Sequence, residues 1–216
     1  MLLALDTATQ YASIALYDGQ WVLAELNWRS ERRHTVELAP QVNQLLRLAG
    51  VTPADLTVLG VGIGPGSYTG TRIALSFAKG IALSLAIPLV GVSTLDALAY
   101  PHLPAPAPLC ALVAAGRGRY GWAIYTPGTN IPQRETDFGL HKMPELLPHL
   151  PPNSLMVGEM SAADRAWVHD ERAGTITLLS PARALRRAGA LAELAWARFL
   201  AHQTDDPVSL SPIYLG

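Results

Sequence analysis

The chain has 216 residues, of which 50% are hydrophobic and only 15% are charged, so it carries far more apolar side chain than a disordered segment does. Size scaling for compact proteins predicts that roughly 70% of its surface is buried on folding, enough for one large core or two smaller ones. No run reaches the ~18 consecutive apolar residues of a membrane helix, so we expect no membrane contact. The net charge of −1 predicts no strong field that attracts nucleic acid, and an RNA role would depend on a partner.

Cys110 is the single cysteine, which excludes a disulfide framework within this chain and a cysteine-based zinc site. Such cysteine usage is typical of reducing compartments, so we expect a cytoplasmic localisation. Because Cys110 lies inside an apolar run, we interpret it as a small buried strand residue rather than a reactive thiol.

Short strands are expected at the start of the chain. Apolar and alternating runs predict three of them, at 2–6, 12–17 and 20–28. Asp18-Gly19 joins the last two, and this dipeptide is a strong hairpin signal because Gly tolerates the positive φ of a tight turn. The fold therefore begins with an antiparallel meander.

Helices and further strands follow the meander. Apolar positions three and four residues apart predict an amphipathic helix at 35–48, which either kinks at Pro40 or begins its regular part there. A buried strand at 57–63, a glycine-rich loop at 64–70 and a helix at 71–86 then form a strand–loop–helix unit. This order predicts an α/β protein.

The best candidate for a domain boundary is a stiff segment with four prolines, namely Pro101, Pro104, Pro106 and Pro108. It divides the chain into expected domains at 1–100 and 101–216. The last helix, expected at 182–202, has a broad apolar face, so we expect it to pack across a large surface, with the first domain as one candidate.

The second half repeats the element order of the first. Strands are expected at 109–114, 120–126 and 131–138, with a glycine-rich turn at 116–118 between the first two and a short helix at 142–150 after the third. This is a repeat of architecture and not of sequence.

Asp6, Thr7 and Thr9 form the first candidate site, because they lie at the end of the first strand. A carboxylate followed by hydroxyls can hold a hydrated magnesium ion and grip phosphate oxygens, as in ATPases. The alternative is a turn in which these side chains cap the local backbone. Spacing alone leaves both interpretations open.

The glycine-rich loop is the most specific local signal, and its candidate residues are Gly64, Gly66, Ser67, Thr69 and Gly70. It can bring backbone close to a ligand or another chain. It lacks the Gly-Lys-Ser/Thr of a Walker A loop, and it has neither the hydrolase elbow nor the dinucleotide-binding pattern. The alternative is a structural turn whose glycines permit tight packing.

No metal or catalytic constellation can be argued from the sequence. His34 has no histidine partner at helical spacing, and the chain contains no H-x-x-x-H pair. No Ser-His-Asp or Cys-His arrangement is evident either. We therefore predict no catalytic residue and no metal site.

Five segments together resemble one family: LLALDTAT at 2–9, RRHTVELAP at 32–40, GPGSYTGTRIALSFAKG at 64–80, AGRGRY at 115–120 and SPIYL at 211–215. The chain is similar to the TsaB (YeaZ) family, the bacterial partner subunits in synthesis of threonylcarbamoyladenosine in transfer RNA. The resemblance implies the ASKHA fold, named after actin, sugar kinases and heat-shock ATPases. It implies two ribonuclease H-like lobes, the second one reduced.

The resemblance further implies a non-catalytic dimerisation and activating subunit of the complex that modifies the adenosine next to the anticodon. Its implied partners are a TsaD-type catalytic subunit and a TsaE-type ATPase, with transfer RNA contacted only through the complex. No cofactor is expected on the chain itself, while ATP or ADP at the complex interface is left open. A homodimer is a further expectation when the partner is absent.

One departure from the ASKHA enzymes supports this interpretation. Where the second lobe of the family commonly has an aspartate before Ala-Gly-Arg-Gly-Arg, this chain has Ala114. Phosphoryl transfer would then lack its second carboxylate. The alternative function is an ATP-dependent kinase or hydrolase of the same fold that uses Asp6 and the 64–70 loop. A peptidase, which older names of the family suggest, has no nucleophile or metal signature here.

The expected partner interface lies on the two helices of the first half. The apolar stripe of the first helix supplies Val36, Ala39 and Val42. Small residues of the second helix, Ala74, Ala78 and Ala82, are expected to leave flat ground for close helix approach from outside.

Overall fold

The computed structural model describes residues 1–31, 33–172 and 174–215. The first half contains the strands β1 (Leu2–Asp6), β2 (Tyr11–Tyr17), β3 (Val22–Arg29), β4 (Val58–Gly62) and β5 (Leu89–Val92). The second half contains β6 (Leu109–Ala114), β7 (Arg119–Tyr125), β8 (Gly139–Lys142), β9 (Ser154–Gly158) and β10 (Ile176–Leu178). The α-helices are α1 (His34–Leu48), α2 (Tyr68–Leu85), α3 (Thr94–Ala99), α4 (Met143–Leu146), α5 (Ala162–Glu171) and α6 (Ala188–Leu200). Short 3₁₀ turns lie at Pro53–Asp55, Tyr100–His102 and Leu147–His149.

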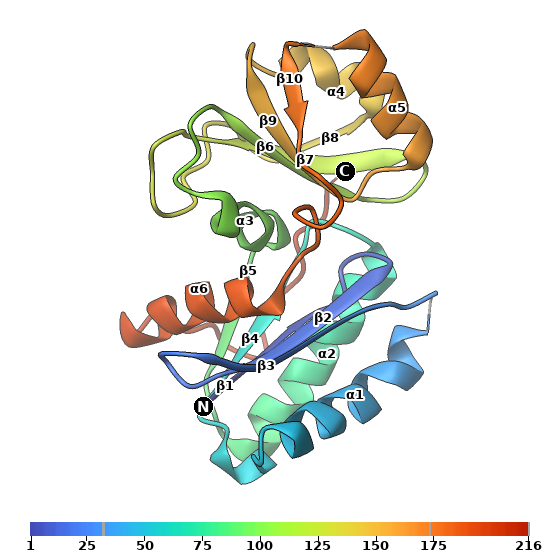
Figure 1. The fold of residues 1–216 in the computed structure, drawn as a ribbon. Coiled ribbons are helices and arrows are strands. Elements are labelled where there is room, and N and C mark those ends of the chain that lie inside the picture. The colour runs from blue at the N-terminus through green and yellow to red at the C-terminus, as the bar shows by residue number, and fades with distance from the viewer. Residues whose placement is uncertain (32, 173, 216) are drawn as a thin grey trace.

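The strands form two mixed sheets of the same topology (Figure 1). The order is β3-β2-β1-β4-β5 in the first sheet and β10-β9-β6-β7-β8 in the second. In each, the central strand pairs antiparallel with the strand that follows it and parallel with the fourth strand of its set. The predicted repeat of architecture and the α/β fold of two lobes are confirmed.

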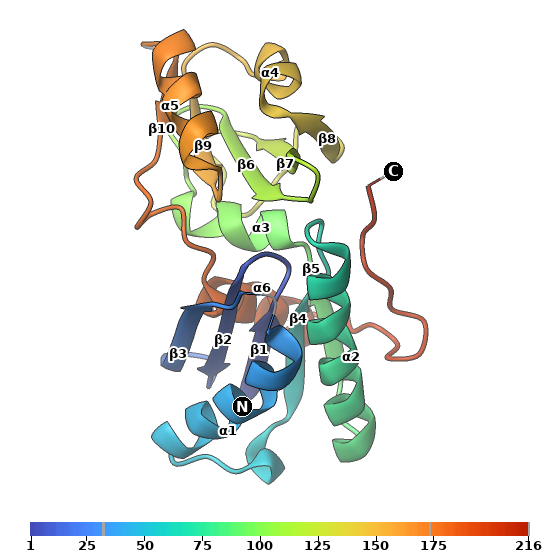
Figure 2. The same cartoon turned by 90° about the vertical axis from the view of Figure 1, so that its right-hand side faces the viewer.

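Helices separate and enclose the two sheets (Figures 1 and 2). α1 and α2 cover one face of the first sheet, and α6 covers the other. α3 packs on both α6 and the second sheet, whose far face carries α4 and α5. α6 thus belongs in space to the first lobe although it follows the second in the chain. The pair α1 and α2 forms the outermost layer at its end of the molecule.

The sequence of β1 explains this layering. Successive side chains of a strand point to opposite faces of the sheet. Leu3 and Leu5 pack with the residues of α1 and α2, whereas Leu2 and Ala4 pack with those of α6. All four are fully buried, as in strands that are covered on both faces.

The hairpin between β2 and β3 forms where it was predicted. Gly19 has a φ of +101°. One carboxylate oxygen of Asp18 accepts hydrogen bonds from the backbone N–H groups of Gln20 and Trp21, at 2.8 and 2.7 Å. The turn is therefore closed by the dipeptide that signalled it.

Several predicted boundaries are wrong, mainly in the second lobe. The segment 131–138 forms no strand and pairs with β7 through an isolated bridge at Arg134, because Pro132 interrupts it without a donor. The strand lies at 139–142 instead. The helix expected at 142–150 is one short turn, α4, followed by a 3₁₀ turn that contains Pro148. α6 begins only at Ala188, because the residues before it cross between the lobes.

The second lobe is smaller in its elements. β8 has 4 residues against 8 in β3, and α5 has 10 against 18 in α2. Within the described residues, no helix is long and apolar enough to span a membrane.

Candidate functional site

An arginine occupies the place where the sequence analysis put a nucleotide. Asp6 ends β1 with its side chain only 4% exposed, and Oδ1 lies 2.6 Å from Nη1 of Arg186. The same oxygen accepts a hydrogen bond of 2.7 Å from the backbone N–H of Ala8. The predicted metal-binding carboxylate is therefore already paired with a protein cation.

The other nitrogens of Arg186 reach both lobes. Nε donates to Oε1 of Glu159, just past the end of β9, at 3.0 Å. Nη2 donates to the hydroxyl of Thr9 at 2.7 Å and also to the carbonyl oxygen of Tyr11. The Thr9 hydroxyl in turn donates to Oε2 of Glu159 at 2.5 Å. One side chain thus ties the end of β1, the turn after it and the end of β9 together.

The charge of Arg186 is stabilised inside the protein. Its side chain is 3% exposed, and this burial alone would lower its pKa. The carboxylates of Asp6 and Glu159 outweigh the burial and raise the pKa of Arg186 above its usual value. The cluster Asp6, Arg186, Glu159 and Thr9, called the interlobe cluster below, is a buried cation held between two acids.

Thr7, the third residue predicted to bind nucleotide, faces away from the interlobe cluster. Its hydroxyl donates to the carbonyl oxygen of Gly70 at 2.7 Å and accepts from the backbone N–H of Ala74 at 3.1 Å. Thr7 therefore fastens β1 to the start of α2. The structure brings Asp6 and Thr9 together and leaves Thr7 in a packing role.

The glycine-rich loop is packed against the β1–β2 turn. Ser67 donates its backbone N–H to the carbonyl oxygen of Ala8 at 2.6 Å, and its hydroxyl caps α2 by accepting from Gly70 at 3.2 Å. A Cβ on Gly66 would clash with the carbonyl oxygen of Ala8, and a Cβ on Gly70 with that of Thr7.

Clearance, rather than a positive φ, thus explains Gly66 and Gly70. Among the candidate loop glycines only Gly64 has a positive φ, of +91°. Thr69 is exposed and belongs to a groove described below. These contacts favour the structural interpretation of the loop.

Candidate metal ligands do not gather in the described part of the chain. No group of three or more His, Cys, Asp or Glu residues there is placed to hold a metal ion. Burial raises the pKa of the Cys110 thiol to about 12, so this cysteine is unreactive at neutral pH. Ala114 ends β6 as an exposed residue.

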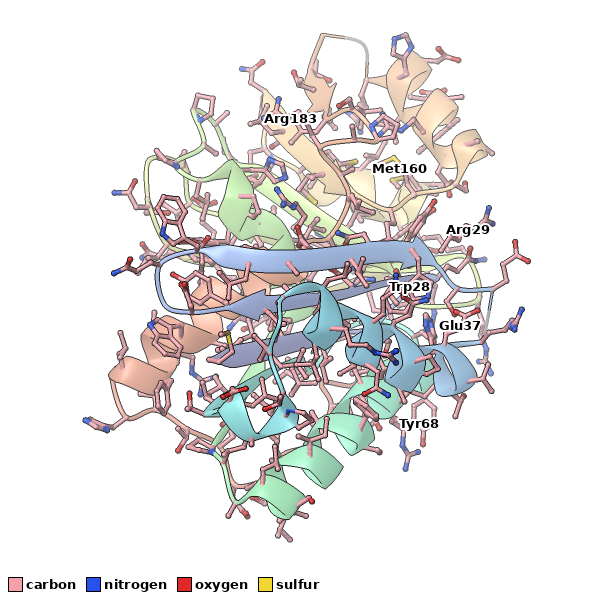
Figure 3. All side chains as sticks on the ribbon, turned by 60° about the horizontal axis from the view of Figure 1, so that its bottom comes forward. Trp28, Arg29, Glu37, Tyr68, Met160 and Arg183 are labelled. Carbon is pink, nitrogen blue, oxygen red and sulfur yellow. The ribbon has the colours of Figure 1, made fainter. Side chains whose placement is uncertain are left out.

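A groove with a volume of about 590 Å³ runs between α1 and α2. Its lining is mostly apolar and comes from both helices: Thr35, Leu38, Ala39, Tyr68, Thr69, Arg72, Ile73, Ser76 and Phe77. A second hollow of about 420 Å³ continues along the same helix pair and shares Ala39 and Phe77. Figure 3 shows Tyr68 at the start of α2 and Glu37 on α1, on the side of the molecule where the groove begins.

Four of the six predicted interface residues are buried in the chain itself, so their assignment to the interface is wrong. Ala74, Ala78 and Ala82 are at most 1% exposed, because this stripe of α2 packs on the first sheet. Val42 is also buried, at 4% exposure. A residue covered by its own sheet cannot meet a partner.

The other predicted interface residues lie at the surface. Val36 is 63% exposed, and Ala39 is exposed and lines both hollows. The groove residues Tyr68, Arg72 and Phe77 were missed. The signal that could have found them is the second, mixed polar and aromatic stripe of that helix.

Arg186 and Glu159 were missed as well. Glu159 follows the strand β9 as Asp6 ends β1, so a carboxylate at a strand end was its signal. Arg186 carries no such signal, because the sequence does not distinguish it from the neighbouring Arg187. The structure buries the first and leaves the second exposed.

Comparison with known proteins gives one family. The family model described as "TsaD: tRNA N6-adenosine threonylcarbamoyltransferase" matches residues 28–169. The tRNA threonylcarbamoyladenosine biosynthesis protein TsaB of Escherichia coli (strain K12) is 36% identical over 131 residues, which cover 60% of this chain and 56% of that protein. The chain thus matches little more than half the length of this curated relative.

Solved structures match the whole chain. YeaZ from Pseudomonas aeruginosa superposes with a TM-score of 0.81 at 26% identity and covers 99% of both chains. The ethanolamine utilization protein EutJ from Carboxydothermus hydrogenoformans has a TM-score of 0.57 at 12% identity, over 88% of each chain, a likeness of fold alone. These neighbours confirm the predicted ASKHA-type fold.

Proposed function

The chain belongs to the TsaD-type family and, within it, to the TsaB (YeaZ) group, and we propose from this membership that it is a non-catalytic, activating subunit in the synthesis of threonylcarbamoyladenosine in transfer RNA. In this proposal the TsaD-type partner carries out the transfer to the adenosine. The chain binds that partner and a TsaE-type ATPase. It meets transfer RNA as part of the complex.

The interlobe cluster is the observation that carries the non-catalytic part of the proposal. Phosphoryl transfer on this type of fold needs carboxylates that are free to hold a hydrated metal ion beside the phosphates. Here Asp6 and Glu159 share the cation of Arg186, at 2.6 and 3.0 Å. A metal ion would have to displace a buried arginine that already neutralises both acids.

The alternative, an ATP-dependent kinase or hydrolase that uses Asp6 and the 64–70 loop, meets the same obstacle. Asp6 would have to exchange Arg186 for a magnesium ion. The loop would have to release the carbonyl oxygens of Thr7 and Ala8, on which Gly70 and Gly66 pack. No contact of the described residues favours this function over the first.

The groove between α1 and α2 supports the partner-binding part of the proposal. Large apolar and aromatic residues with one arginine line it, a composition typical of interface centres. At the end of the groove near the start of α2, the guanidinium of Arg72 lies 4.9 Å from the ring centroid of Tyr68. The ring centroid of Tyr214 lies 5.1 Å from that of Tyr68. Tyr68 and Tyr214 are 60% and 52% exposed.

We propose that the TsaD-type subunit binds in this groove. The groove's one charged lining residue, Arg72, stacks on tyrosine and forms no ion pair with a described residue, so a partner with a helical apolar face and a nearby carboxylate fits it. A second copy of this chain is the competing occupant, and binding of the two should then be mutually exclusive.

Co-purification with the organism's TsaD-type protein tests the proposal. The two chains, mixed at micromolar concentration, should elute as a complex in size-exclusion chromatography with light scattering. The chain alone should elute as a monomer or dimer, and the dimer should dissociate when the partner is added. Two separate peaks at all concentrations would contradict the proposal.

A further inference from the structure

Three basic side chains gather at the end of the second sheet that lies near α2. Arg117 is exposed at the tip of the β6–β7 turn, with a φ of +55°, between Gly116 and Gly118, which also have positive φ values. Arg119 begins β7, and Lys142 ends the neighbouring strand β8. We call Arg117, Arg119 and Lys142 the hairpin cluster.

The hairpin cluster is electrostatically unfavourable in the protein alone. Arg119 and Lys142 are directly opposite in the antiparallel ladder, which places their Cβ atoms about 5 Å apart. Like charges at such positions destabilise a sheet. None of the three side chains forms an ion pair with a residue that the structure describes. The carboxylate of Glu145 accepts from the backbone N–H of Lys142 rather than from its ammonium group.

Arg119 adds an unused donor. Its Nε is buried and has no hydrogen-bond partner among the described residues. A buried donor without a partner destabilises the folded state. A bound anion would offset the repulsion between Arg119 and Lys142 across the ladder.

The hairpin cluster lies beside the first lobe. Gly121 lies two residues along β7, on the same face as Arg119. A Cβ built on it would be 3.2 Å from both Pro65 of the glycine-rich loop and Leu215, a tight contact. Figure 2 shows the β6–β7 turn next to the start of α2 and the C-terminal segment. The opposite face of β7 carries Trp122 into the core under α4 and α5.

We propose that the hairpin cluster binds a phosphate group of a ligand of the complex. Two arginine forks and one ammonium suit the tetrahedral, multiply charged oxygens of phosphate. The inference rests on the proposed function, in which transfer RNA is the substrate and ATP is present. A backbone phosphate of the RNA is therefore the first source of this group, and a nucleotide phosphate is the second.

Binding measurements with charge-neutral variants test the proposal. The variant Arg117→Ala/Arg119→Ala is assembled with the TsaD-type partner, and its affinity is measured for fluorescein-labelled full-length transfer RNA and, separately, for ATP. The matched control is Arg172→Ala, an exposed arginine at the α5 end of the second sheet, opposite to Arg119. Each lost phosphate contact should reduce the slope of log K against log salt by about one.

The expected result is a salt slope lower by about one for transfer RNA, because one phosphate loses its contact, and an unchanged affinity for ATP. A loss for ATP instead of RNA also supports the site and identifies the nucleotide as its ligand. Unchanged binding of both probes, or an equal loss in Arg172→Ala, overturns the inference. So does loss of the partner itself, because the hairpin cluster would then contact an acidic protein surface.

The unfolding midpoint of a further variant, measured without ligand, distinguishes a loss of binding from misfolding. The variant Lys142→Ala removes the like-charge pair, so its unfolding midpoint should stay the same or rise, while its affinity for the phosphate-bearing ligand should fall. A wild-type assembly that does not form would contradict the proposed function. A wild-type assembly that forms, and that binds both RNA and ATP as the variants do, would contradict only this inference.

Discussion

Arg186 carries a charge that is buried between two acids of different lobes. Replacing it with Met keeps much of its volume and leaves Asp6 and Glu159 buried without a cation. We expect Arg186→Met to lower the free energy of unfolding by about 3 to 5 kcal/mol in urea titration. Arg187→Met is the control, because its side chain is 61% exposed and pairs with one carboxylate, that of Glu25, so we expect a smaller loss. Equal losses in the free energy of unfolding in the two variants would contradict a larger contribution of the buried Arg186 to stability.

The glycines of α2 offer a second matched pair. Gly70→Ala places a methyl group against the carbonyl oxygen of Thr7, so we expect a loss of about 1 to 3 kcal/mol in the free energy of unfolding. Gly80→Ala meets no atom within 4 Å on the same helix and should stabilise it by about 0.5 to 1 kcal/mol. Urea titration of both variants checks the opposite signs, and two effects of the same sign would contradict this packing.

Cys110 provides a probe of global opening. It is fully buried, and burial raises its thiol pKa to about 12. At pH 8 the folded protein should therefore react with a thiol reagent only as fast as it unfolds, and urea should raise the rate to that of a free thiol. A full reaction within seconds in the absence of urea would contradict the burial.

Sequence reasoning at this scale located Asp6 but not its partner. The end of a strand is a local property, and the sequence signalled it. The contact of Asp6 with Arg186 joins residues far apart in the chain, and it depends on how the two lobes close. Only the three-dimensional arrangement could distinguish Arg186 from the exposed Arg187.

At the scale of elements, a variant in the groove between α1 and α2 can test partner binding independently of folding. Ala39→Glu places a carboxylate on the exposed wall of the groove, so we expect an unchanged unfolding midpoint and at least a tenfold weaker affinity for the TsaD-type partner, about 1.4 kcal/mol. Ala163→Glu, an exposed position on α5, is the control and should change neither quantity. Isothermal titration with the partner measures both affinities. Native affinity in Ala39→Glu would place the interface elsewhere.

The same helix pair shows what periodicity could not determine. The helices themselves were predicted well, since α1 and α2 differ from the expected ranges by at most three residues at their starts. α2, however, has apolar residues on two sides: Ala74, Ala78 and Ala82 face the sheet, while Ile73 and Phe77 line the groove. Periodicity finds such stripes without telling which one the sheet covers, and the small residues were assigned to the wrong side.

At the scale of the whole molecule, the repeated lobe could be predicted because its order of strands follows local signals along the chain. The boundaries in the second lobe could not, since Pro132 and Pro148 shorten elements whose apolar patterns run longer. The position of α6 on the first sheet depends on a long return of the chain. Its broad apolar face indicated a large contact, and the structure supplies it through β1, β2, β4 and β5.

Reconstituted modification tests the central claim most directly. Transfer RNA lacking the modification is incubated with the threonylcarbamoyl adenylate donor and the TsaD-type partner, with or without this chain, and threonylcarbamoyladenosine is quantified after digestion. We expect strong formation of the modified nucleoside only when both proteins are present, none with this chain alone, and loss of the stimulation with Ala39→Glu. Modification by this chain alone, or a partner whose activity does not respond to the chain, would contradict the account.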